Sequence, residues 1–328
     1  MKRRLALILL VVLGLSPGVY WREALPPPDR TPRVDASQIV GPGARIGGPN
    51  GPVVEGVWHL TSPNDLFGSY SALLALPDGS LLSFGDQGNW LRLPHPPGGP
   101  AQFGEDFPHL DADKPMRDVE SATRDPATGR IWLGLEGRNA IIRMKGDLSD
   151  QQVVQPPAMQ DWPYNLGPES LLRIADGRFL VLSEGQIAPG GRSVGLLFPS
   201  DPVDGAQPQS FTFVPPGNER PSDIAQLPDG RVLVLTRGVD LLGLPPHFTV
   251  HLLLADPAAI RPGEDWPWRL VAKIGGNAVP FENYEGLAVS GGKDGGPVTL
   301  WIICDDNQSR IIQRTLLVKL KWRVPPRR

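Results

Sequence analysis

The sequence predicts an all-β protein, and within that class a β-propeller. Glycine and proline reach 38 residues each in a chain of 328, which disfavours long helices but suits short strands joined by tight turns. A hairpin unit also recurs, with turns at Asp78-Gly79, Thr128-Gly129, Asp176-Gly177 and Asp229-Gly230. Repeats of about 40–50 residues that contain several strands are typical of propeller blades.

Each repeat consists of two apolar strands around a turn whose residues accept a positive φ. Five units can be counted, and they begin at Ser71, Glu120, Glu169, Ser222 and Glu285. Runs such as "NAIIRM" and "FTVHLLLA" lie between the hairpins and can supply third and fourth strands. We therefore expect five blades. Six is the alternative, if a degenerate unit lies after Trp90 or Leu242.

The ring is expected to close through an N-terminal strand. The run "VEGVWHLTSP", from Val54 to Pro63, precedes the first hairpin, whereas the last repeat ends near Trp322 with one strand too few. Pairing these two segments would protect edges that are otherwise exposed. The sequence thus predicts a single propeller domain over residues 51–324, preceded by a Pro/Gly-rich linker at residues 24–50.

The first 23 residues resemble a signal peptide or an N-terminal anchor. Lys2, Arg3 and Arg4 precede an apolar run from Leu5 to Leu15, which is the order found in secretory signals. This run is shorter than the about 20 residues that span a bilayer. We expect a periplasmic or extracytoplasmic protein, associated with the membrane if this segment is retained.

Charge and known motifs exclude several function classes. The net charge is −3 with lysine and arginine scattered singly, whereas nucleic acid binding calls for a clustered basic face. The sequence contains no Gly-x-Ser-x-Gly elbow, Walker motif, HExxH or Cys-x-x-Cys. We expect a monomer that binds a small anionic or ester substrate.

Acidic residues recur at one position of the hairpin. In an antiparallel pair, the residue that starts the first strand and the residue that ends the second lie at the same rim. These positions pair Ser71 with Asp86, Glu120 with Glu136, Glu169 with Glu184, Asp223 with Arg237, and Glu285 with Asp305 and Asp306. Since the first strand of each blade lines the central channel, we expect these carboxylates to converge at the channel mouth.

Converging carboxylates repel one another unless a cation or protons neutralise them. Oxygen ligands without histidine or cysteine favour Ca²⁺ or Mg²⁺ over Zn²⁺. The predicted ligands of a divalent ion, with Ca²⁺ preferred, are Glu120, Glu169, Asp223, Glu285 and Asp305. In the alternative interpretation, these acids cap turns and loop amides.

Further residues near this rim suggest catalytic and binding roles. Asp306 or Glu136 would be the general base. Arg138, Arg237 and Arg314 follow the second strands of their blades and, with Asn307, would bind an anionic substrate. Surface salt bridges are the alternative role for each arginine.

The motifs "NYEGLAV", "LWIICDDN" and "QRTLLVKLKW" resemble the C-terminal signature of the esterase-like phytase family, which consists of exported bacterial proteins. The resemblance extends through "RPSDIAQLPDGRVLVLTRG" and "PESLLRIADGRFLVLSEG" to the first repeats, and covers His59 to Trp322. It implies a β-propeller fold and the hydrolysis of phosphate esters or carboxyl esters.

These observations lead to one main hypothesis and two alternatives. The main hypothesis is an exported, metal-assisted hydrolase of phosphate esters or carboxyl esters. The first alternative is a non-catalytic periplasmic propeller that binds a ligand or a protein across the same rim. The second is a propeller hydrolase of the lactonase type.

Overall fold

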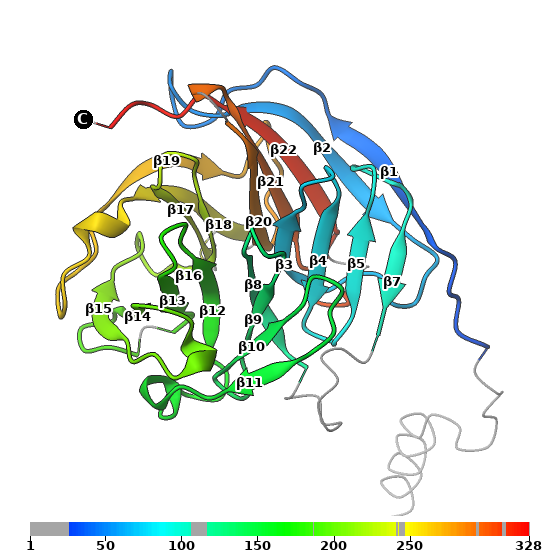
Figure 1. The fold of residues 1–328 in the computed structure, drawn as a ribbon. Coiled ribbons are helices and arrows are strands. Elements are labelled where there is room, and N and C mark those ends of the chain that lie inside the picture. Colours follow the sequence, from blue (N-terminus) through cyan, green and yellow to red (C-terminus); the bar gives the residue numbers. More distant parts are fainter. Residues whose placement is uncertain are drawn as a thin grey trace, which may run out of the picture.

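The computed structural model describes residues 26–105, 117–185, 187–240, 242, 247–292, 295–309 and 313–327. The predicted signal peptide or anchor lies outside these ranges. Five antiparallel sheets surround a central axis (Figure 1). This arrangement confirms the all-β, five-bladed propeller, because the described residues contain no sixth blade.

The strands fall into five sheets, numbered here as blades in chain order. Blade 1 comprises β3 (Tyr70–Ala75), β4 (Leu81–Gly85), β5 (Trp90–Leu93) and β7 (Gln102–Gly104). Blade 2 comprises β8 (Val119–Arg124), β9 (Ile131–Leu135), β10 (Ala140–Met144) and β11 (Gln152–Val154). Blade 3 comprises β12 (Pro168–Arg173), β13 (Phe179–Ser183), β14 (Ser193–Phe198) and β15 (Gln209–Phe213). Blade 4 comprises β16 (Arg220–Gln226), β17 (Val232–Asp240), β18 (His247–Ala255) and β19 (Trp268–Ile274). Blade 5 comprises β20 (Tyr284–Gly291), β21 (Val298–Cys304), β22 (Leu316–Trp322), β2 (Val53–Thr61), β1 (Arg33–Val40) and β6 (Gly99–Pro100).

The first strand of each blade lies against the first strands of its neighbours. β3 contacts β8, β8 contacts β12, β12 contacts β16, β16 contacts β20, and β20 contacts β3. Apolar side chains fill the space between blades. For example, Leu82 and Phe84 of blade 1 pack in one cluster with Leu133 and Ile142 of blade 2. Burying one such side chain contributes about 1.5–3 kcal/mol, so the packing between blades holds the ring together.

The predicted turns join the first two strands of four blades. Gly79 and Gly230, for instance, adopt φ values of 85° and 87°, in the left-handed region that glycine enters without steric cost. Their N–H groups donate to the carbonyls of Leu76 and Leu227. These turns lie at the rim opposite the beginnings of the first strands.

The N-terminal strand closes the ring as expected. β2 pairs with β22 and completes blade 5, with Val57 opposite Val318. Beyond it, β1 pairs with β2 and with the short β6. Residues 33–40 therefore form a strand within the region predicted to be a linker, and this part of the linker prediction is corrected.

Helices contribute little to the described chain. They are three 3-10 turns of three residues each, at Pro157–Met159 (η2), Pro202–Asp204 (η3) and Pro257–Ala259 (η4). No helix among the described residues has the length and hydropathy needed to cross a membrane. Cys304 is buried and unpaired.

Candidate functional site

Every first strand has a β-bulge near its beginning, at the second residue in four blades and at the third residue in blade 4. The pairing register shifts there in all five blades, at Ser71, Glu120, Glu169, Ser222 and Glu285. A bulge leaves its extra residue outside the ladder and re-aims the side chain. Across the hairpin from these five residues are Asp86, Glu136, Glu184 and Asp305, which directly follow the second strands of their blades, and Arg237, which lies within β17. We call the rim formed by these ten positions the channel mouth.

The bulge in blade 4 corrects one sequence prediction. The residue equivalent to Glu169 is Ser222, whereas Asp223 pairs with Leu235 inside the sheet. The spacing could have shown this, since Glu169 and Ser222 each stand eight residues before the turn glycines Gly177 and Gly230.

Three carboxylates converge in blade 2. One ligand oxygen from each of Asp118, Glu120 and Glu136 lies within 4.8 Å of the other two. The sequence predicted the meeting of Glu120 and Glu136 but missed Asp118. Asp118 stands two residues before Glu120, and alternate residues of an extended chain share a face, so this signal was present. We call these three residues the acid cluster.

Burial and mutual repulsion disfavour ionisation of the carboxyl groups in the acid cluster. Burial raises the pKa of Glu136 to about 7, and the charges of Asp118 and Glu184 add to that shift. Burial also raises the pKa of Glu120 well above its ordinary value, and the carboxylates of Glu169 and Glu285 raise it further. A cation would relieve this repulsion, and the all-oxygen donor set suits a hard divalent ion.

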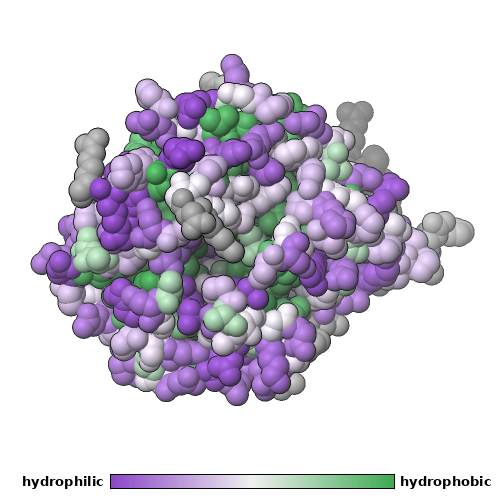
Figure 2. Space-filling view, turned by 45° about the horizontal axis from the view of Figure 1, so that its top comes forward, coloured by the Kyte–Doolittle hydropathy of each residue, from purple (hydrophilic) through white to green (hydrophobic). Residues whose placement is uncertain are grey.

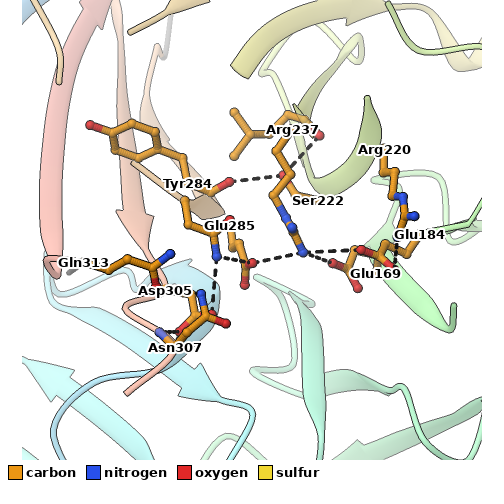
Figure 3. A network of polar contacts seen from close by, with 12 residues as sticks. Glu169, Glu184, Arg220, Ser222, Arg237, Tyr284, Glu285, Asp305, Asn307 and Gln313 are labelled. Atoms are coloured by element: carbon orange, nitrogen blue, oxygen red, sulfur yellow. Dashed lines mark hydrogen bonds and ion pairs between the residues drawn. The ribbon is translucent and has the colours of Figure 1, made fainter. Parts of the chain in front are cut away.

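A second group of carboxylates surrounds one arginine (Figure 3). Nη2 of Arg237 lies 3.0 Å from Oε1 of Glu285, 3.2 Å from Oε1 of Glu169 and 3.4 Å from Oε1 of Glu184. Burial by itself would lower the pKa of Arg237, but these carboxylates raise it above its usual value. Arg220 adds a second contact, 3.1 Å from Glu184. We call Arg237 and its three carboxylates the arginine cluster.

The arginine cluster changes the interpretation of three predicted residues. Glu169 and Glu285 were predicted metal ligands, and Arg237 was predicted to bind substrate. Instead, their side chains contact one another, and the Arg237 side chain is only 21% exposed. Its charge is already matched by carboxylates, so we find no free guanidinium for an anionic substrate at this position.

Asp305 lies beside the arginine cluster and is linked to it through Asn283. Nδ2 of Asn283 donates to Glu285 at 2.8 Å and lies 3.4 Å from Oδ2 of Asp305. Burial raises the pKa of Asp305 to about 8, with the charge of Glu285 contributing. Asn307 donates its backbone N–H to Asp305 and its side-chain amide to Gln313.

Two predicted site residues hold the backbone instead. The carboxylate oxygens of Asp223 accept the N–H groups of Ile224 at 2.8 Å and of Leu287 at 2.6 Å, which connects blades 4 and 5. These contacts correspond to the capping alternative and move Asp223 out of the metal set.

Asp306 also joins segments of backbone. It accepts the N–H groups of Ser69 and Gln308 and the hydroxyl of Thr315. Asp306 is only 2% exposed. A carboxylate occupied by three donors is poorly suited to be a general base, so Glu136 is the better candidate of the two.

The two remaining predicted arginines differ in their surroundings. Arg314 forms an ion pair with Glu282 at 2.6 Å, which corresponds to the salt-bridge alternative. Arg138 follows Glu136 by two residues in the β9–β10 hairpin. Within the part of the chain that the structure describes, its guanidinium has no ion-pair partner.

A cavity of about 380 Å³ lies at the same rim as the acid cluster. It is formed by the segments that connect β2 to β3, β4 to β5, β7 to β8, and β21 to β22. Its lining includes Phe67, Ser69, Gln87, Asn89 and Arg117, and Arg117 directly precedes Asp118 in the chain. The cavity therefore offers polar groups and one aromatic side chain, whereas the three acids of the acid cluster are not part of its lining.

The space-filling view is mostly hydrophilic, with hydrophobic side chains in small separate areas (Figure 2). On the described residues visible in this view, no broad hydrophobic face is seen.

Comparison with protein families gives one match. The model of the family "Phytase-like: Esterase-like activity of phytase" matches residues 65–308. No curated protein matches the chain in sequence.

Several solved structures share low similarity with the chain. The nidogen/laminin complex has 12% identity and a TM-score of 0.45, covering 83% of this chain and 88% of that one. The PQQ-bound aldose sugar dehydrogenase from Streptomyces coelicolor has 12% identity and a TM-score of 0.43, covering 90% and 99%. A gluconolactonase from Xanthomonas campestris has 13% identity and a TM-score of 0.44, covering 91% and 100%. At these values we draw no functional conclusion from them.

Proposed function

Because the chain belongs to the phytase-like family, described by the esterase-like activity of phytase, we propose that it is a metal-assisted hydrolase of ester bonds. The observation that carries this proposal is the convergence of Asp118, Glu120 and Glu136 within 4.8 Å at the channel mouth. Three carboxylates with no nitrogen or sulfur donor fit a hard cation, and Ca²⁺ is our proposed ion.

A bound cation would polarise the ester and lower the pKa of a coordinated water. The chain itself contributes the ligand oxygens of Asp118 and Glu120 and a proton acceptor. Glu136 suits that role: its pKa is about 7 in the metal-free protein, and a cation held by its neighbours would lower this pKa and favour the ionised form, which accepts a proton.

Arg138 is the proposed anion-binding residue. It is the predicted arginine that has no ion-pair partner among the described residues, and it stands two residues after Glu136. A guanidinium there can bind the phosphate or carboxylate of an ester through two parallel hydrogen bonds. We propose that the cavity of about 380 Å³ at the same rim holds the rest of the substrate.

We also propose export to the periplasm or another extracytoplasmic site. The basic and apolar residues at positions 2–15 support this location. The described chain begins at the channel-mouth rim, where Asp29 and Asp65 are hydrogen-bonded to each other. Intact mass of the protein from a bacterial periplasm, compared with the full-length mass, tests cleavage.

The test of the activity is hydrolysis with and without a chelator. Phosphomonoester, short acyl ester and lactone substrates should be assayed with purified protein in Ca²⁺ and in EDTA. We expect turnover on at least one class, its loss in EDTA, and at least a 100-fold lower kcat for Glu136→Gln, since general bases contribute about 10²–10⁴-fold.

Glu264→Gln is the matched control, because Glu264 is an exposed glutamate in the segment between η4 and β19, away from the mouth. It should retain wild-type turnover. Absence of turnover on all three classes while the acid cluster binds Ca²⁺ would contradict the hydrolase and favour the non-catalytic binding propeller.

A further inference from the structure

Blade 4 departs from all the other blades across the hairpin, where it carries an arginine instead of an acid, and it shares a serine at the bulge with blade 1. Blades 2, 3 and 5 carry an acid at the bulge and another across the hairpin, and blade 1 carries Ser71 and Asp86. Blade 4 instead has Ser222 at the bulge and Arg237 across from it. Its contribution to the mouth is therefore a positive charge rather than one or two negative charges.

The guanidinium of Arg237 fills the space between blades 3 and 5. Its Nη2 atom lies 3.0–3.4 Å from carboxylate oxygens of Glu169 and Glu184 on one side and Glu285 on the other (Figure 3). These three carboxylates are only 4–11% exposed, so bulk water screens them little.

Ser222 makes room for this arrangement. Its hydroxyl lies 3.4 Å from the carbonyl oxygens of Leu235 and Tyr284, and its side chain is too short to add a fourth carboxylate. Ser222 and Arg237 thus act together, because the serine adds no acid and the arginine supplies a cation.

We propose that Arg237 is a built-in counter-ion in a second cation position of the channel mouth. The guanidinium closes the group formed by Glu169, Glu184 and Glu285 to divalent metals. The mouth consequently takes one exchangeable cation, at the acid cluster, instead of two. This inference deepens the proposed function and rests on it for the metal at the acid cluster.

The physical reason is the permanence of the arginine charge. Arginine stays protonated at every pH at which proteins fold, and it is covalently attached, so it does not dissociate when the metal concentration falls. Three buried carboxylates within reach of one point need compensation by a cation or by protons. An exchangeable ion would leave them uncompensated whenever it departed, whereas Arg237 does not.

The test is the number of divalent ions bound. Calorimetric titration with Ca²⁺, supported by terbium luminescence, should give one ion for the wild type. Arg237→Ser should gain a second site with a dissociation constant on the order of 10⁻⁴–10⁻³ M, as for weak calcium sites. Arg237→Lys retains a positive charge and should still bind one ion.

Double substitutions identify which residues form the gained site. Arg237→Ser with Asp118→Asn should keep the new site and weaken the original one at least tenfold. Arg237→Ser with Glu285→Gln should weaken the new site at least tenfold and keep the original one. The inference is overturned if Arg237→Ser binds the same number of ions as the wild type with the same affinities.

Two further results separate this inference from the proposed function. If the wild type binds no divalent ion and Arg237→Ser binds one, the counter-ion role stands and the metal at the acid cluster is refuted. If Arg237→Ser is unfolded without metal, millimolar Ca²⁺ should restore the wild-type circular dichroism spectrum. Failure of Ca²⁺ to restore the fold, when Arg237→Lys is folded, counts against a cation position.

Discussion

Asp305 makes the stability of the metal-free protein depend on pH. Its carboxyl has a pKa of about 8 in the folded chain, against an ordinary value of 3.8, because burial and then the charge of Glu285 disfavour ionisation. Between about pH 4 and pH 8 the folded state holds a proton that the unfolded chain has released. The free energy of unfolding must therefore fall as pH rises through this window, and it is unaffected below pH 4.

The size of the effect follows from the same shift. Each pK unit corresponds to about 1.4 kcal/mol, so from pH 4 to pH 7 Asp305 alone lowers the free energy of unfolding by up to about 4 kcal/mol. Asp305→Asn keeps the shape and an acceptor for the Asn307 N–H but cannot ionise. We expect the variant to match the wild type at pH 4 and to be more stable by up to about 4 kcal/mol at pH 7.

Urea unfolding in EDTA, followed by tryptophan fluorescence at each pH unit from 4 to 8, measures this difference. Asp35→Asn is the control, because Asp35 is half exposed on the edge-region strand β1. It should follow the wild-type pH dependence, with an offset within about 0.5 kcal/mol. If Asp305→Asn also runs parallel to the wild type over this range, the proton is not held by Asp305 and the reasoning is refuted.

Three further substitutions separate backbone-holding acids from metal ligands. Asp223→Ala leaves the buried N–H groups of Ile224 and Leu287 without an acceptor and should cost about 2–5 kcal/mol in urea unfolding, with Ca²⁺ affinity unchanged. Asp306→Ala should behave in the same way, and a tenfold loss of Ca²⁺ affinity in either variant would return that residue to the metal set. Glu285→Gln should reduce Ca²⁺ affinity less than Glu136→Gln in parallel titrations, because Glu285 contacts Arg237; equal losses would contradict the separation of the two clusters.

The fold could be predicted from local signals. Turn glycines repeat with a regular spacing, and the strands around them are apolar, so both the hairpins and the number of blades follow from the sequence. Closure through β2 followed from a missing strand at the C-terminal end. β1 was missed because only Val34 of its eight residues is buried. Its pairing therefore rests on backbone hydrogen bonds, which leave no apolar pattern in the sequence.

The candidate site was predicted less completely, for two physical reasons. In blade 4 the acid Asp223 was aligned by residue type, whereas the bulge at Ser222 depends on position relative to the turn. In addition, ionic partners come from different blades. Arg237 meets Glu169 and Glu285, which are 68 and 48 residues away in the chain, and only the closed ring brings them together.

The acids of the mouth form two neighbouring groups. In blades 3 to 5, Arg237 contacts the carboxylates of Glu169, Glu184 and Glu285, so part of their negative charge is compensated within the fold and does not depend on solution ions. In blade 2, the charge of Arg237 also acts on Glu120 and Glu136, and the nearby guanidinium of Arg138 has no ion-pair partner among the described residues.

The cavity lies among loops of blades 1, 2 and 5, and Arg117 in its lining directly precedes Asp118 of the acid cluster. A site that exchanges ions and substrate needs groups whose interactions are incomplete in the free protein, since groups already paired must lose one partner to gain another. The proposed chemistry therefore belongs over blades 1 and 2. Substitutions at the mouth positions of blades 3 to 5 should accordingly change stability more than turnover.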